Sequence, residues 1–158
     1  MTKKLLINQV LLVFLLVGIG FQSCKKDDIK KKQAEKDEQI IKDYLATNQL
    51  EALRHESGLY YIIIEEGSGA HPTVNSTVKV LYKGYLTNGE IFDQTNQDAR
   101  VFKLKNLIEG WRIGIPMLKE GGSGIFLIPS AMGYGSNQVG AIPPNSVIIF
   151  EIELLSIL

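Results

Sequence analysis

Every second residue from 78 to 86 falls on one largely apolar face, and this alternation predicts a half-buried strand. The Asn-Gly pair at 88–89 is typical of a tight hairpin turn, because both residue types tolerate positive φ angles. The returning strand carries Phe92 and Asp93, and a carboxylate beside an aromatic ring is costly unless another group binds it. The hairpin therefore offers Tyr82, Phe92 and Asp93 as one candidate wall of a pocket.

The remaining apolar patterns predict a sheet with one short helix. Further strands are expected, in chain order, at residues 59–66, 101–104, 123–128 and 147–158, whereas residues 50–55 allow a short strand without requiring one. Residues 109–118 are predicted to form the helix, near the start of which lies the single tryptophan, Trp111. Together these elements predict five or six strands and an α+β fold, in which helices are segregated from an antiparallel sheet.

A second helix is predicted over residues 34–47, ahead of the sheet. The apolar residues that recur there at the spacing of one helical face are Ile40, Ile41, Tyr44 and Leu45. Such a face can pack on the following domain or on a second copy of the chain, and the sequence leaves both arrangements open.

Residues 1–23 are predicted to be a secretory signal peptide. Two lysines give a basic start, and an apolar stretch follows from Leu5 to Phe21. The dense apolar run is shorter than the roughly 20 residues that span a bilayer, which disfavours the alternative of an uncleaved membrane anchor. Cys24 stands where cleavage would leave it first in the chain, and this arrangement resembles a bacterial lipoprotein signal. The resemblance implies lipid attachment to the Cys24 thiol, and several acyl chains would hold the protein to a membrane.

Residues 24–38 are rich in charge and are predicted to be a tether that is poorly ordered or a frayed helix. The first part, Lys25 to Asp28, resembles a surface-export signal of lipoproteins in some Gram-negative bacteria, although a plain solvated tether explains it as well. We therefore expect a lipoprotein of the cell envelope, in the outer membrane and exposed at its surface. Residues 39–56 hold the helix and a short connection to the domain at 57–158.

Charge and cysteine content limit the classes of function. The chain has 17 basic and 17 acidic residues, and its aromatic residues are not interleaved with basic ones, so nucleic-acid binding is not expected. With one cysteine the chain cannot form an internal disulfide or a cysteine-based metal site. His55 and His71 have no second ligand type at metal spacing and are expected to be surface histidines. Neither a metal nor a cofactor is expected.

Motifs spread over residues 57–158 carry a family resemblance. They are Val80 to Leu86, Gly89, Phe92, Asp93, Phe102, Leu107 to Trp111, Gly114, Leu118, Ile128, Pro129, Gly133 to Gly135, Ile142 to Ser146 and Phe150 to Leu155. With these residues the domain resembles the FKBP-type peptidyl-prolyl cis-trans isomerases. The resemblance implies a strongly bent antiparallel sheet wrapped around one short helix. It also implies proline-containing polypeptides as substrates and a macrolide such as FK506 as an inhibitor.

The resemblance implies a pocket for the substrate proline, formed by Tyr82, Phe92, Asp93, Phe102, Leu107, Ile108, Trp111, Tyr134, Ile142 and Phe150. Trp111 would be its floor, although on residue type alone a tryptophan at the start of a helix favours ordinary core packing. Phe92, Phe102 and Phe150 would be its aromatic walls.

Roles for individual residues follow from the same resemblance. The Ile108 backbone N–H and the Tyr134 hydroxyl would donate hydrogen bonds to substrate carbonyls. The catalytic residues are then expected to be Asp93, Tyr134, Trp111 and Phe92.

Two departures from the family pattern affect this pocket. The place where the family often has an arginine or lysine to pair with the aspartate is Asp98 here, and Arg100 lies two residues on. The sequence therefore predicts that Asp93 is supported by Tyr82 alone and that activity is altered. The loop between Gly135 and Ile142 is slightly shorter than in the small cytosolic members of the family. Ala141 in this loop replaces a bulkier apolar residue, which would open one rim of the pocket.

Three functions are compatible with these patterns. The favoured one is a membrane-anchored isomerase that assists the folding of exported proteins. A weakly supported Asp93 suggests the alternative of a proline-peptide-binding or chaperone module with little catalysis. The apolar face of the 34–47 helix suggests the third, an interaction partner of a surface or motility machine.

Overall fold

The structure is a computed structural model that describes residues 27–158. The predicted signal peptide and the predicted lipidation site Cys24 lie outside these residues. Residues 36–158 form one compact unit, whose fold is described here. The chain is helical from 27 to 47, so the predicted helix is present and the charged residues before it are helical too. Within the described part of the chain, no helix combines the length and apolar character needed to cross a bilayer.

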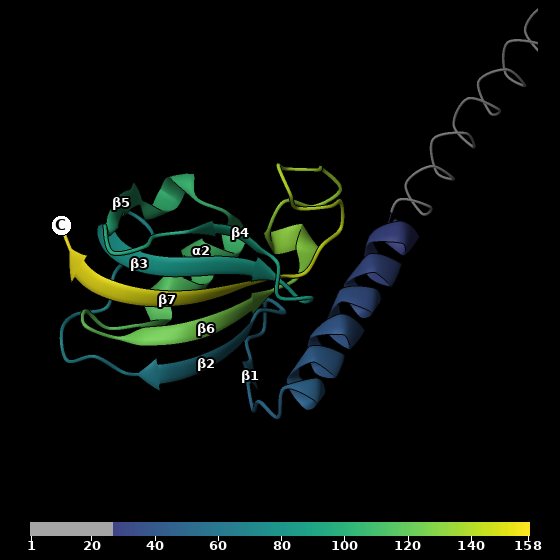
Figure 1. The fold of residues 1–158 in the computed structure, drawn as a ribbon, viewed down its shortest axis with the longest axis horizontal. Helices are drawn as coiled ribbons and strands as arrows, with labels where there is room; N and C mark the ends of the chain where they lie inside the picture. Colours follow the sequence, from purple (N-terminus) through teal and green to yellow (C-terminus); the bar gives the residue numbers. More distant parts are fainter. Residues whose placement is uncertain (1–26) are drawn as a thin grey trace, which may run out of the picture. The chain divides into compact units, whose positions relative to one another are not determined.

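Seven strands form one antiparallel sheet (Figure 1). They are β1 (Leu53–Arg54), β2 (Tyr60–Glu65), β3 (Thr77–Leu86), β4 (Ile91–Gln94), β5 (Arg100–Lys103), β6 (Ser123–Ile128) and β7 (Ile148–Ile157). Their order is β1-β2-β6-β7-β3-β4, and β5 also pairs with β3. The α+β fold is confirmed. The strand number exceeds the predicted five or six because β1, two residues long within the segment that the sequence left undecided, also pairs into the sheet.

One short helix packs against this sheet. It is α2 (Glu109–Gly114), which continues as the 3-10 turn η2 (Ile115–Met117). The α-helical pattern stops there because Pro116 lacks the N–H that would donate to the carbonyl four residues earlier. A Cβ atom on Gly110 would lie 2.6 Å from Ile128, so only glycine lets α2 approach β6 this closely.

The main core lies between α2 and the inner face of the sheet. Inward side chains alternate along the two long central strands: Val78, Val80 and Tyr82 on β3, and Ile148, Phe150, Ile152 and Leu154 on β7. The register sets Tyr82 opposite Ile152 and Gly84 opposite Phe150. Because Gly84 has no side chain, it leaves space at the end of the core where aromatic rings from neighbouring strands meet.

The outer face of the sheet is covered in part by the 27–47 helix. Ile41 is fully buried and Leu45 is nearly so, and both pack with Tyr85, Leu127 and Ile149. These strand residues alternate with the inward-facing ones, so they belong to the opposite face. The helical face that the sequence left without an assigned partner therefore packs on the chain's own domain.

Candidate active site

A cavity of about 140 Å³ opens between the sheet and α2. Its lining consists of Tyr82, Asp93, Phe102, Leu107, Ile108, Trp111, Tyr134 and Phe150. All of these belong to the predicted pocket, so the fold brings together residues that lie far apart in the sequence. The other two predicted members, Phe92 and Ile142, are not part of the cavity lining. Phe92 packs edge-on against Phe150 with ring centroids 5.5 Å apart, and Ile142 is buried in the core.

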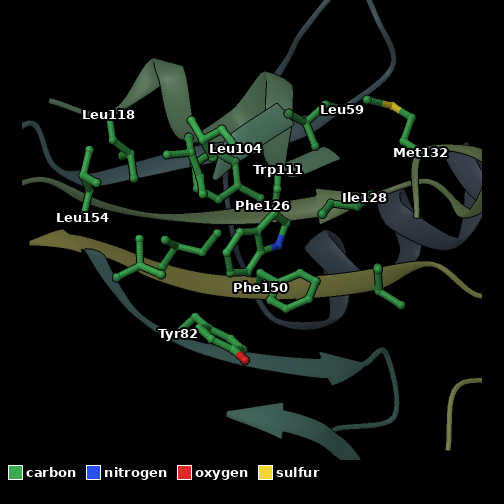
Figure 2. Packing of buried hydrophobic residues seen from close by; sticks show 14 of the residues in the cluster. Leu59, Tyr82, Leu104, Trp111, Leu118, Phe126, Ile128, Met132, Phe150 and Leu154 are labelled. Atoms are coloured by element: carbon green, nitrogen blue, oxygen red, sulfur yellow. The ribbon is translucent and has the colours of Figure 1, made fainter. Parts of the chain in front are cut away.

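Trp111 forms the floor of the cavity from the first turn of α2. Its ring lies edge-on to three others, with centroids 5.1 Å from Tyr82, 5.1 Å from Phe150 and 5.7 Å from Phe102. Edge-to-face pairs at these separations are favourable beyond the area they bury. Figure 2 shows the indole against the Phe150 ring, with Tyr82 on the neighbouring strand. The packing role and the floor role, weighed as alternatives in the sequence, are both filled by the same side chain.

The indole N–H of Trp111 is buried and has no hydrogen-bond partner within residues 27–158. The side chain is 5% exposed, so water does not readily replace that partner. A buried donor left unpaired costs about 1–3 kcal/mol of folding free energy. The floor of the cavity is thus built at a cost to stability, which is typical of functional positions.

Asp93 is held at the cavity rim by two different side chains. The Tyr82 hydroxyl donates to Asp93 Oδ2 at 2.6 Å. Arg100 Nη1 donates to the Tyr82 oxygen at 2.7 Å and lies 3.3 Å from Asp93 Oδ1. The guanidinium also stacks over the Tyr82 ring, 5.6 Å from its centroid. Two side chains from two neighbouring strands, Tyr82 on β3 and Arg100 on β5, therefore fix the orientation of the Asp93 carboxylate on β4.

The prediction that Asp93 is supported by Tyr82 alone was wrong. Counting along the loop from Asp93 leads to Asp98, but the register of the sheet decides which residue reaches the site. Because β5 pairs with β3, Arg100 lies opposite Val80 and its long side chain extends to Tyr82. The sequence shows this arginine, but it does not show the strand pairing that directs its side chain towards Tyr82. The role of Arg100 was therefore missed.

Burial raises the pKa values of both tyrosine hydroxyl groups in the cavity. Burial, together with the hydrogen bond to Asp93, raises the pKa of Tyr82 to about 12. Burial also raises the pKa of Tyr134, and the negative charge of Asp93 adds to this effect. Both tyrosines are therefore O–H donors at neutral pH. The Tyr82 hydroxyl already donates to Asp93, so Tyr134 is the tyrosine that can donate to a carbonyl oxygen in the cavity.

Tyr134 reaches the cavity from a turn with defined backbone hydrogen bonds. The turn follows η3 (Ser130–Met132), and Gly135 adopts a φ of 60°, which favours glycine. The Gly135 carbonyl accepts a hydrogen bond from the Asn145 N–H at 2.7 Å. On the opposite side, Ile108 precedes the first turn of α2, so its N–H is not used by the helix itself.

A larger hollow of about 370 Å³ lies on the other face of the sheet. Its lining includes Lys83, Glu151 and Glu153, which alternate with the inward-facing residues, and Lys83 Nζ pairs with Glu151 at 2.9 Å. The charged side chains of this open hollow do not point towards one common position where a substrate could react. The cavity floored by Trp111 is smaller but unites aromatic walls with oriented polar groups, so we take it as the functional site.

The predicted surface histidines lie away from this cavity. His71 Nδ1 is within 3.1 Å of the Pro116 carbonyl and 3.0 Å of the Leu118 carbonyl, and His55 Nδ1 lies 2.8 Å from the Ser57 hydroxyl. No cluster of three histidine, cysteine or acidic side chains suited to a metal ion occurs between residues 27 and 158.

Comparison with known proteins places the domain in a family. A family model described as FKBP-type peptidyl-prolyl cis-trans isomerase matches residues 69–155. This chain belongs to that family. The FKBP-type match spans β3 to β7 and so includes every residue that lines the cavity.

Two curated relatives and one solved structure show how far the FKBP-type similarity extends. FkpA of Aeromonas hydrophila is 36% identical over 141 residues, which are 84% of this chain and 53% of the relative. FkpA of Escherichia coli (strain K12) is 40% identical over 103 residues, 64% of this chain and 38% of the relative. The crystal structure of FkpA from Escherichia coli matches with a TM-score of 0.70 at 31% identity, covering 96% of this chain and 71% of that one. The chain thus spans about half the length, or less, of these curated relatives.

Proposed function

We propose that this protein is a peptidyl-prolyl cis-trans isomerase that acts on proline-containing polypeptides. The observation that carries the proposal is the Trp111-floored aromatic cavity with Asp93 fixed at its rim by Tyr82 and Arg100. The cavity volume of about 140 Å³ suits a side chain the size of a proline ring rather than a large cofactor.

The chemistry requires no nucleophile and no proton transfer. Rotation about an X–Pro bond breaks amide conjugation and has a barrier of about 18–20 kcal/mol. A catalyst needs only to bind the twisted amide better than the planar one. Twisting reduces charge separation across the C–N bond, so an apolar aromatic cavity favours the twisted form over water. Each preference of about 1.4 kcal/mol speeds turnover tenfold.

The residues of the cavity divide this task. Trp111 and the phenylalanine rings exclude water and hold the proline ring. The Tyr134 hydroxyl donates to a substrate carbonyl, and the Ile108 N–H donates to another. Asp93, held in one orientation, supplies a fixed negative charge beside the turning amide. Such fixed dipoles act more strongly in a water-poor cavity than in solvent.

We further propose that the protein assists the folding of exported proteins as an envelope lipoprotein. The support is the basic and apolar start of the chain, followed by Cys24 as its single cysteine. Lipid on Cys24 would anchor the domain through the charged residues that follow, in the outer membrane and with exposure at the cell surface. Replacing Cys24 with alanine should abolish labelling by radioactive palmitate and release the protein from the membrane fraction. Unchanged labelling of the variant would contradict the lipid anchor.

The isomerase activity is tested with proline peptides in a protease-coupled assay. The wild-type protein should accelerate the cis-to-trans conversion of an Ala-Leu-Pro peptide, and FK506 should inhibit it. Asp93→Leu and Trp111→Ala should each lower kcat/KM by about tenfold or more without unfolding the domain. Lys103→Gln, which changes an exposed side chain on β5, is the matched control. A wild-type rate equal to the uncatalysed rate would contradict the proposal.

The two other functions considered from the sequence lose their main support. A binding module with little catalysis was suggested by a missing basic partner for Asp93, and Arg100 is that partner. An interaction partner of a surface machine was suggested by an exposed apolar helical face, but Ile41 and Leu45 of that face are buried against the chain's own sheet.

A further inference from the structure

A buried carboxylate outside the cavity is joined to the segment that carries Tyr134. Asp37 belongs to the 27–47 helix and is 1% exposed, and Ser130 is also 1% exposed. Asp37 Oδ2 accepts two hydrogen bonds from Ser130, one from the backbone N–H at 2.9 Å and one from the hydroxyl at 2.6 Å. The two residues are 93 positions apart in the chain. This contact therefore ties the helix that precedes the domain to a turn of the domain itself.

Ser130 in turn fixes the backbone on both sides of Tyr134. The Ser130 carbonyl accepts a hydrogen bond from the Gly133 N–H at 3.0 Å and another from the Gly135 N–H at 2.8 Å. One serine thus uses its N–H and hydroxyl to bind Asp37 and its carbonyl to bind the two neighbours of Tyr134. A shift of Ser130 would move both hydrogen bonds and, with them, the direction of the Tyr134 side chain.

The physical cost of this arrangement indicates a specific role. A carboxylate removed from water destabilises a protein unless hydrogen bonds compensate for its lost hydration. The short bonds from Ser130 are of the charge-assisted kind, which are stronger and more directional than neutral ones. An apolar pair could attach the helix to the sheet, as Ile41 already does, but would not fix the position of the Ser130 carbonyl.

We propose that Asp37 is a positioning residue for Tyr134, so that the helix ahead of the domain takes part in catalysis through its contact with Ser130. Asp37 does not line the cavity and is connected to Tyr134 through the hydrogen bonds described above. The catalytic half of this inference rests on the proposed isomerase function. The structural half, which is control of the Tyr134 turn by Asp37, can be measured without turnover.

The catalytic half is tested by a double-mutant cycle in the purified full chain. Asp37→Leu keeps the number of non-hydrogen atoms in the side chain but removes its acceptor oxygens, and it should lower kcat about tenfold with KM changed by less than about twofold. Asp37→Asn retains a carbonyl oxygen that can accept both bonds from Ser130 and should recover most of the rate. In a Tyr134→Phe background, Asp37→Leu should change kcat by less than about twofold, because the group it positions is already gone.

Controls separate positioning from a general loss of structure. Asp43→Asn alters an exposed carboxylate of the same helix, which binds Gln39, and should leave the rate unchanged. If Asp37→Leu does not fold, Ser130→Ala replaces it, because it removes the hydroxyl and retains the N–H. That variant should give a smaller fall, of about threefold, with the same dependence on Tyr134. Equal effects of either variant in the presence and absence of the Tyr134 hydroxyl would overturn the inference.

Amide hydrogen exchange tests the structural half and separates the two proposals. Loss of the Asp37 carboxylate should speed exchange of the Gly133 and Gly135 amides about tenfold or more, while the Ile152 amide in β7 keeps its protection. A wild-type protein without turnover would overturn the proposed function, and the glycine exchange rates would then decide whether Asp37 controls the turn. Unchanged exchange at both glycines would overturn the inference even in an active enzyme.

Discussion

Arg100 donates a 2.7 Å hydrogen bond to the Tyr82 hydroxyl across 18 positions of sequence. The same hydroxyl donates to Asp93, so the tyrosine oxygen is both acceptor and donor in one short chain. Guanidinium groups suit this role because they stack on an aromatic ring and donate in a fixed plane at the same time. Arg100, Tyr82 and Asp93 therefore hold one another in one preferred arrangement at the rim of the cavity. The effect of this arrangement on substrate binding can be measured by replacing Arg100.

Replacement of Arg100 with glutamine should lower kcat/KM about fivefold, because Asp93 and Tyr82 lose their shared orientation. Stability should change by less than about 1 kcal/mol, since both partners of the ion pair are half exposed and solvent screens them. The protease-coupled assay and urea unfolding measure the two effects. Lys103→Gln on the same strand should affect neither. An Arg100→Gln protein with wild-type kcat/KM would show that the guanidinium has no role in the site.

Two substitutions of Trp111 should separate its packing from its unpaired N–H. Trp111→Ala should cost about 3–5 kcal/mol of unfolding free energy, because it removes a large buried ring. Trp111→Phe should cost much less, since the lost packing is offset by removal of a buried donor that has no partner in the described chain. Both variants should bind a proline peptide more weakly than the wild type, as measured by calorimetry. Equal stability losses for the two would contradict the cost assigned to the N–H.

Gly84→Ala should destabilise the protein by about 1–3 kcal/mol through overpacking. A Cβ atom at this position would lie 2.5 Å from the Phe150 ring and 2.7 Å from the Phe92 ring. Urea unfolding followed by Trp111 fluorescence measures the loss. Because the clash involves side chains, adding Phe92→Leu should recover part of the stability by giving up ring atoms. If the double variant is no more stable than Gly84→Ala alone, the close approach to Phe92 is not the cause.

Packing of the 27–47 helix predicts different effects for two of its isoleucines. Ile41 is fully buried among side chains of the outer sheet face, so Ile41→Ala should cost about 2–4 kcal/mol. Ile29 lies on the same helix but is 68% exposed, so Ile29→Ala should change stability by less than about 0.5 kcal/mol. Chemical denaturation measures both values. Similar small effects at the two positions would show that the helix does not stabilise the domain.

Alkaline pH should weaken the fold over a defined range. The pKa of Tyr82 is raised to about 12 in the folded chain, whereas an unfolded tyrosine has a pKa of about 10. The folded chain therefore binds this proton more tightly, so its stabilising effect is complete below about pH 10 and is lost as the pH rises towards 12. Denaturation series between these pH values measure the slope. Tyr82→Phe should flatten it in part, because burial also raises the pKa values of Tyr134 and Tyr85. An unchanged slope would exclude Tyr82 as a source.

Much of the fold could be predicted because its signals are local. The alternation over 78–86 marked β3, and the Asn-Gly pair marked the turn to β4. The two residues of β1 carry too little pattern to be assigned to a strand, so the strand number was underestimated. The end of α2 was missed because Pro116 allows a 3-10 turn to continue the helical path.

The site residues were predicted mainly from residue identity. The prediction was incomplete where the pairing of strands determines which side chains meet. The cavity lining was included in the predicted set, since motifs spread along the chain identify it. The role of Arg100 depends on the pairing of β5 with β3, which does not follow from counting residues after Asp93. Likewise, the contact between Asp37 and Ser130 joins segments 93 residues apart, and a charged run gives no sign that one carboxylate within it is buried.

The position of β7 has a consequence for how this domain is made. β7 ends at Ile157 and lies in the middle of the sheet, with β6 on one side and β3 on the other. A growing chain that has not yet released residues 148–157 from the ribosome leaves β6 paired only with β2, and β3 paired only with β4 and β5, with no strand joining the two parts of the sheet. Closure of the sheet must therefore wait for synthesis through this strand, since distant pairing is slow and comes late.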